Sequence, residues 1–277
     1  MKYTLQTTKY ILKNFFYIFP IALVPAFFLS FTIAREDMLA VWEKVIGGNA
    51  QALTFTEIFQ MVSIFNFASV ETIVFGLAGI VALVVCGALL MAFLDKHMRI
   101  GKRTFNGMFA RLNENFLPTL GVVTLLFFIY EFWTVLTSAL FLFAATLPAP
   151  VSYIAAAIVY LGMHFVLLSV VAAIYLWLPC MQITGFKAFE ALRYSYILCE
   201  PIRWRIIITQ AVFLMFAEAV IMASVILLPD SAILMCVVAT IFYAVMIMQF
   251  CVRMQIAYFD REQIERADLK KYYHLYD

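Results

Sequence analysis

Residues 70–94 read VETIVFGLAGIVALVVCGALLMAFL, in which Glu71 is the only charged side chain. As a helix this stretch can cross a bilayer, because a hydrocarbon core of about 30 Å needs about 20 residues at about 1.5 Å each. Backbone groups exposed to lipid must pair among themselves, and a helix achieves this within one segment. The stretch lacks the alternation of polar and apolar residues that a barrel strand shows. It therefore predicts a transmembrane helix.

The apolar character of this stretch extends over the whole chain. Of the 277 residues, 65% are hydrophobic and 13% are charged, and the mean hydropathy is +0.97. A water-soluble domain carries about 25% charged residues, so this composition excludes an ordinary soluble protein. With 10 Gly, 8 Pro and 5 Cys, the chain is also not collagen-like, disordered or a disulfide scaffold. The net charge of +2 gives no basis for binding nucleic acid.

Six apolar stretches are long enough to span a membrane, and they predict an all-α polytopic membrane protein. The expected spans cover residues 15–34, 70–94, 118–146, 154–181, 206–228 and 232–252. Pro20 and Pro25 lie in the first span, where they are expected to kink the helix or leave carbonyl groups free. Together with a loop over residues 35–69 and a tail over residues 253–277, these spans form a single integral membrane domain.

The Lys and Arg residues are divided unequally between the two sides of these spans. Of all 19, only Arg35 and Lys44 fall in the segments on one side. Because basic segments remain in the cytoplasm, we expect a multi-pass protein of the cell (inner) membrane with both termini cytoplasmic. The loop over residues 35–69 is then extracytoplasmic. There we expect an amphipathic helix, a turn at Gly47-Gly48 and a second segment near residues 55–66, all on the outer surface.

Two of the cytoplasmic connections have similar sequences. The pattern Gly-x-x-x-Phe occurs at residues 101–105 and again at residues 185–189, 84 residues later. Each copy is followed by apolar residues spaced three and four apart, and then by a proline, Pro118 or Pro201. This arrangement predicts a parallel internal duplication with two interfacial helices on the cytoplasmic side.

Each interfacial helix has two interpretations. It is a connector that covers the inner ends of the bundle, or it is a platform for anionic lipid or a soluble partner. A polybasic lipid signal needs about 4–8 clustered charges, more than the segment around Arg99 carries. We expect contacts with membrane lipids and with another membrane or cytoplasmic protein. The candidate contact residues are Arg99, Lys102, Arg103, Arg193, Asp260 and Arg261.

Three ionisable residues, Glu131, His164 and Glu218, lie near the middle of expected spans. A charged group there costs at least about 2.5–3.5 kcal/mol on insertion scales, so we expect the three to face the bundle interior and share one polar site. In a structural interpretation, protonated glutamates bond His164 or tyrosines and hold the helices together. In a functional one, the three line a pathway for protons or cations. A metal site is not expected, because the set matches zinc by ligand type only.

The second connection and the tail carry motifs of a known family. These are Pro179, Ala191-Leu192-Arg193-Tyr194-Ser195, Tyr258-Phe259-Asp260-Arg261 and Glu265-Arg266-Ala267-Asp268-Leu269. Over residues 175–269 the chain resembles the multi-span membrane domain of some bacterial glycerophosphoryl diester phosphodiesterases and of related stand-alone proteins. The resemblance implies a six-helix membrane domain without an activity, because that chemistry belongs to a separate soluble barrel. It makes Arg193 and Asp260-Arg261 anchors where the chain leaves the membrane, and the tail is expected to pair with the short helix.

The sequence contains none of the HExxH, GxxxxGK[ST] or GxSxG signatures. We therefore predict a non-enzymatic integral membrane scaffold or accessory subunit, without a cofactor. The alternative is a small transporter or lipid-handling protein with a midplane polar site, in one version coupled to protons. An intramembrane enzyme is the third interpretation, and no nucleophile and base stand at a spacing that favours it.

Overall fold

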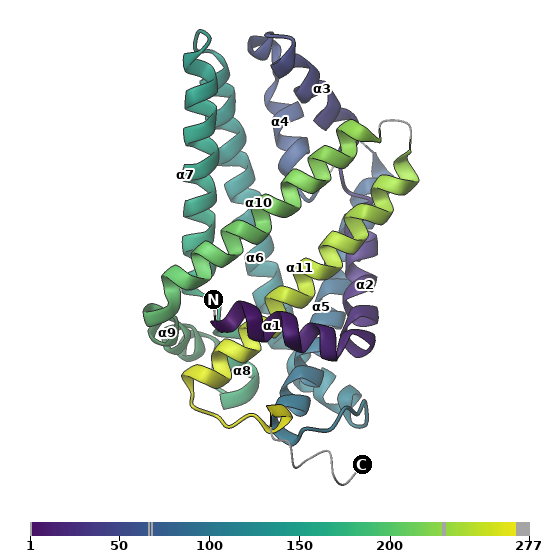
Figure 1. Cartoon of the computed structure of the whole chain (residues 1–277), viewed down its shortest axis with the longest axis vertical. Helices are drawn as coiled ribbons and strands as arrows, with labels where there is room; N and C mark the ends of the chain where they lie inside the picture. Colours follow the sequence, from purple (N-terminus) through teal and green to yellow (C-terminus); the bar gives the residue numbers. More distant parts are fainter. Residues whose placement is uncertain (1, 66, 68, 229–230, 270–277) are drawn as a thin grey trace.

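The computed structural model describes residues 2–65, 67, 69–228 and 231–269, and this part of the chain is built from helices without strands (Figure 1). Five helical stretches are long and apolar enough to cross a membrane, and a bent pair at the N-terminus makes a sixth if it is one span. The predicted all-α polytopic membrane protein is confirmed. The long elements are α5 (Val70–Ile100), α6 (Met108–Ala145), α7 (Val151–Ala173) with α8 (Trp177–Thr184), α9 (Ala188–Cys199) with α10 (Arg203–Leu227), and α11 (Ala232–Arg261).

Short elements gather at the two opposite ends of the long helices (Figure 1). One end, which we call the α1 end, holds α1 (Lys2–Lys13), α8, α9 and η3 (Ala267–Leu269). The other, the α3 end, holds α3 (Arg35–Ile46) and α4 (Phe55–Val62), with η1 (Ala50–Ala52) between them. These two helices occupy the loop in which the sequence predicts two segments separated by a turn.

The first predicted span is a bent pair of helices. α1 and α2 (Phe15–Ser30) meet at 97°, with Asn14 at the break. The Asn14 side chain donates a hydrogen bond of 3.0 Å to the Tyr10 carbonyl, at the end of α1. α2 continues through Pro20 and Pro25, so the sharp bend precedes both prolines instead of falling at them. The bend lays α1 across the end of the bundle, where it packs against α11 (Figure 1).

The long helices pack side by side in a closed circuit. α2 lies between α5 and α11, and α6 lies between α5 and α7. α10 completes the circuit, because it contacts both α7 and α11. The approach of α2 to α5 is close at Gly79, where an added Cβ would lie 2.7 Å from Cδ2 of Leu29. A larger residue at this crossing would displace the Leu29 side chain.

The connection before the third span differs from the prediction. α6 begins at Met108 and runs unbroken through Pro118, so the boundary expected at this proline is wrong and the interfacial segment continues into the span. Next to this proline, Thr119 donates its hydroxyl to the Asn115 carbonyl at 2.7 Å and accepts from the Gln182 amide at 3.0 Å, which attaches α6 to α8.

The second connection, between α8 and α10, contains a break at its proline that the first connection lacks. Gly101 ends α5 and Gly185 ends α8, with positive φ angles of 80° and 72°. After α9, however, Pro201 lies in the short helix η2 (Glu200–Ile202), which separates α9 from α10. The fourth predicted span is also interrupted between α7 and α8. The two motifs thus share their glycine and differ at their proline, and the duplication of the whole unit stays a prediction.

The final helix is longer than the sixth predicted span. α11 continues to Arg261, so the first part of the predicted tail is helix, and residues 270–277 lie outside the described part of the chain. Every residue over 252–259 is buried, including Arg253 and Gln255. Arg253 donates to the Arg205 carbonyl at 2.9 Å and so gains a partner inside the protein. Beyond residue 252, where the apolar run ends, α11 is covered by α1, α5 and α8.

Candidate functional site

Two of the three predicted intramembrane residues contact each other. His164 Nε2 on α7 lies 3.0 Å from Glu218 Oε1 on α10. The Tyr160 hydroxyl donates to Glu218 Oε2 at 2.6 Å. His164 Nδ1 lies 2.8 Å from the Tyr160 carbonyl oxygen, which can only accept, so Nδ1 carries a proton. The contact between Nε2 and Oε1 then holds one further proton, carried either by the imidazolium or by the carboxylic acid.

The surroundings of this pair come from a third helix. Trp133 on α6 donates its indole N–H to the Met163 carbonyl at 2.6 Å, and its ring meets the His164 ring edge-on with centroids 5.2 Å apart. The His164 side chain is 5% exposed, whereas that of Glu218 is 35% exposed. The pair therefore joins α7 to α10 and leaves one carboxylate partly accessible.

The third predicted residue, Glu131, serves a different contact. Its carboxylate accepts from the Ser63 hydroxyl at 2.8 Å and from the Ile64 backbone N–H at 3.0 Å. The neighbouring Tyr130 donates its hydroxyl to the Val62 carbonyl at 2.7 Å. Within the described residues, no hydrogen bond joins Glu131 to His164 or Glu218. Glu131 and Tyr130 thus attach the end of α4 to α6, and the segment expected on the outer surface packs against the bundle.

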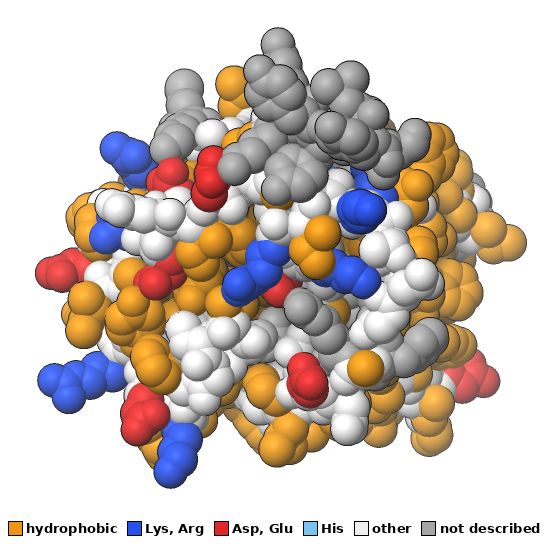
Figure 2. Space-filling view, turned by 90° about the horizontal axis from the view of Figure 1, so that it is seen from below, with side chains coloured by type: hydrophobic (Ala, Val, Ile, Leu, Met, Phe, Trp, Pro, Cys, Tyr) orange, Lys and Arg blue, Asp and Glu red, His pale blue; other side chains and the backbone are white. Residues whose placement is uncertain are grey.

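The residues predicted to contact a partner lie at the α1 end. Arg99 bonds Asp95 at 2.7 Å and lies over the Phe259 ring. Arg103 lies over the Tyr17 ring. Figure 2, which looks onto this end, shows acidic and basic side chains mixed with hydrophobic ones.

The tail contacts the short helix α9 through Tyr194, a residue of the quoted motif, and Glu262, which the sequence did not single out. Tyr194 of α9 donates to Glu262 at 2.6 Å, just beyond α11. Asp260 accepts from the Tyr3 hydroxyl of α1 at 2.6 Å, and the Nε of Arg261 is buried without a hydrogen-bond partner. Arg193 is exposed. The expected pairing of tail and short helix is therefore made by a tyrosine and a glutamate.

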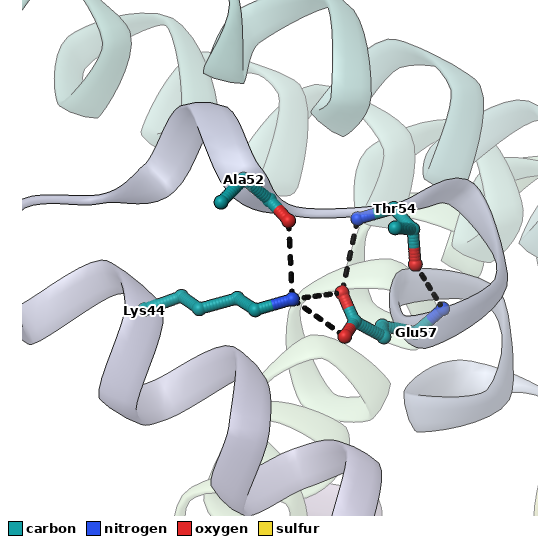
Figure 3. A network of polar contacts seen from close by, with 4 residues as sticks. All are labelled: Lys44, Ala52, Thr54 and Glu57. Atoms are coloured by element: carbon teal, nitrogen blue, oxygen red, sulfur yellow. Dashed lines mark hydrogen bonds and ion pairs between the residues drawn. The ribbon is translucent and has the colours of Figure 1, made fainter.

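A polar network at the α3 end was also missed from the sequence (Figure 3). Lys44 of α3 donates to both carboxylate oxygens of Glu57 on α4, at 2.6 and 2.8 Å, and to the Ala52 carbonyl at 3.0 Å. Thr54 and Glu57 form a capping box at the start of α4. The Thr-x-x-Glu spacing is readable as a capping box, but the partner 13 residues earlier is not.

The network fixes the charge of one carboxyl group and joins two helices. The hydrogen bond from Lys44 holds the pKa of Glu57 below its ordinary value. Because the ion pair links α3 to α4, it constrains the turn that contains Gly47 and Gly48.

Groups of three or more His, Cys, Asp or Glu that could hold a metal ion are lacking in the described ranges. No family model, curated protein or solved structure matches the chain. The resemblance over residues 175–269 stays a prediction.

The His164–Glu218 contact predicts an energetic coupling. In a double-mutant cycle with His164→Leu and Glu218→Leu, we expect an interaction free energy of about 0.6–1.7 kcal/mol, the range of hydrogen bonds inside membrane bundles. Unfolding of the purified protein in mixed micelles measures it. The control cycle combines His164→Leu with Glu131→Leu and should be additive. Coupling in the control cycle equal to that of the first would show that all three residues form one site.

The lowered pKa of Glu57 predicts an acid-sensitive α3–α4 segment. The ion pair stabilises fully above the ordinary Glu pKa of about 4.3, and this contribution is lost as the pH falls through the lowered value. The protection of backbone amides over residues 44–57 against hydrogen exchange, corrected for the intrinsic pH dependence of exchange, should therefore fall on acidification below about pH 4. Glu57→Gln should show low protection at neutral pH, with little further change on acidification. The exposed Glu43 on the same helix provides the control Glu43→Gln, which should behave as wild type; equal acid dependence in Glu57→Gln would contradict this role.

Proposed function

We propose that this chain is a non-enzymatic scaffold or accessory subunit of the cell membrane. The observation that carries the proposal is that all three ionisable groups near the middle of the predicted spans join elements of the bundle. His164 with Glu218 joins α7 to α10, and Glu131 joins α6 to the end of α4. Polar contacts of this kind hold membrane helices together without a catalytic role.

The α1 end is the surface that we assign to a partner. On the positive-inside rule it faces the cytoplasm, because among the described residues all Lys and Arg except Arg35 and Lys44 belong to the segments at that end. Lys102, Arg103 and Arg193 are exposed there. The resemblance of the second half to a membrane domain that occurs joined to a soluble enzyme supports a partner on this side.

Charge reversal at the α1 end tests the proposal. The tagged full chain is cross-linked in intact membranes, purified in mild detergent and analysed by quantitative mass spectrometry. We expect one protein recovered near equimolar amounts, and about tenfold less of it with Lys102→Glu combined with Arg103→Glu, since complementary charges guide and stabilise such contacts. Glu43→Lys on α3 is the matched control at the opposite end and should retain the partner. No reproducible partner, or equal loss in the control, would count against a scaffold.

A second candidate, a small proton-coupled transporter, is favoured by the partial exposure of Glu218. The Glu218 side chain lies 3.0 Å from His164 and is 35% exposed, so part of this carboxyl group is not covered by the protein. In proteoliposomes with an internal pH dye, such a transporter would release an imposed pH gradient when its substrate is added. Glu218→Gln should abolish this flux and Glu131→Gln should spare it. Flux that survives Glu218→Gln would eliminate this mechanism.

A further inference from the structure

A cavity of about 670 Å³ lies at the α3 end, away from both sites described above. Its walls come from the end of α2, the first turns of α11 and the start of α3. Three of its apolar wall residues also face the outside of the bundle, where Phe27 is 47%, Val237 48% and Ile233 81% exposed. In a membrane protein this outer surface meets the acyl chains of lipids, so the cavity is accessible from the side to a hydrocarbon chain.

Arg35, the first residue of α3, lines this cavity and has one guanidinium nitrogen without a partner. Its Nε is buried without a hydrogen-bond partner, and no ion pair or side-chain hydrogen bond of Arg35 occurs within the described residues. The other basic residue at this end, Lys44, is bonded to Glu57. A guanidinium offers five N–H donors in a plane, which matches the oxygens of a phosphate.

Two carboxylates line the same cavity beside Arg35. Asp37 accepts from the amide of Gln60, at 2.9 and 3.2 Å, once that amide is turned with its nitrogen toward the carboxylate. Glu36 is exposed and makes no hydrogen bond or ion pair within the described residues. The head of the cavity therefore presents one unpaired cation and one unpaired anion at adjacent positions of a helix.

We propose that this cavity binds a phospholipid whose head group carries both a phosphate and a primary ammonium, as phosphatidylethanolamine does. The phosphate lies against the Arg35 guanidinium, and the ammonium donates to Glu36. One acyl chain lies along Phe27, Ile233 and Val237. A purely anionic lipid satisfies Arg35 and faces Glu36 and Asp37 with like charge, whereas a choline head group has no N–H to donate to Glu36. Charge complementarity therefore selects the aminophospholipid.

The test measures lipid binding by the purified full chain. The chain is exchanged into a detergent without lipid, and dioleoyl phosphatidylethanolamine, phosphatidylcholine, phosphatidylglycerol or soluble phosphoethanolamine is titrated in. Native mass spectrometry measures the bound fraction. We expect phosphatidylethanolamine to bind about tenfold more tightly than the other two lipids, as the loss of one charge-assisted contact predicts. Soluble phosphoethanolamine should not compete, because it lacks the acyl chain that the apolar walls hold.

Variants separate the two halves of the head group. Arg35→Gln should weaken all three phospholipids by about tenfold, and Glu36→Gln should remove only the preference for phosphatidylethanolamine over phosphatidylcholine. Glu43→Gln, on the same helix and outside the cavity, is the matched control and should bind as wild type. Val237→Trp fills the cavity without changing its charges and should abolish binding, which keeps the test informative if Arg35→Gln fails to fold.

Three results would overturn the proposal. They are wild-type binding by Val237→Trp, tighter binding of phosphatidylglycerol than of phosphatidylethanolamine, and effective competition by soluble phosphoethanolamine. The outcome is independent of the partner experiment, because it concerns the opposite end of the molecule.

Discussion

Burial of the last turns of α11 on every side is the constraint on which the rest of the structure depends. Residues 252–259 include Arg253 and Gln255, and all are removed from solvent. A helix can bury its whole circumference only when other elements surround it, and here α1, α5, α8 and η2 belong to the same core. The polar members are accommodated by bonds such as that from Arg253 to the Arg205 carbonyl. The α1 end is therefore packed around the last turns of α11.

This constraint explains the bend at the N-terminus. α1 must lie across the end of the bundle in order to cover α11, while α2 must run along the bundle between α5 and α11. Tyr3 bonds Asp260 and Tyr10 bonds His97, so α1 is attached at both ends to helices that are distant in sequence. The 97° bend at Asn14 allows α1 to lie across the bundle and α2 to run along it. The α1 end is consequently a fixed surface, as a scaffold that presents charges to a partner requires.

The apolar runs predicted the order of the long helices and five of the six expected spans, because helix formation in lipid depends on local composition; the first expected span is a bent pair. They did not predict where helices break. α6 passes through Pro118, while the chain divides at Pro201, although both prolines follow similar motifs. The same limit applied to the candidate site, where local composition identified residues but not their partners. Charge in an apolar stretch identified His164 and Glu218, but the partners of Glu131 and Tyr194 lie 67 and 68 residues away in the chain and depend on the folded arrangement.

The two basic residues at the α3 end show how little charge position alone reveals about role. Arg35 and Lys44 are equivalent in a count of charges and stand on one helix. Lys44 reaches Glu57 and holds α3 to α4, so its charge is used within the fold. Arg35 has no such partner. It lines a cavity whose walls include apolar side chains exposed on the outer surface of the bundle. A buried donor without a partner destabilises the protein that carries it, so a ligand that satisfies the donor also stabilises the fold. Binding at Arg35 would then stabilise the α3 end, where the first turns of α11 line the same cavity.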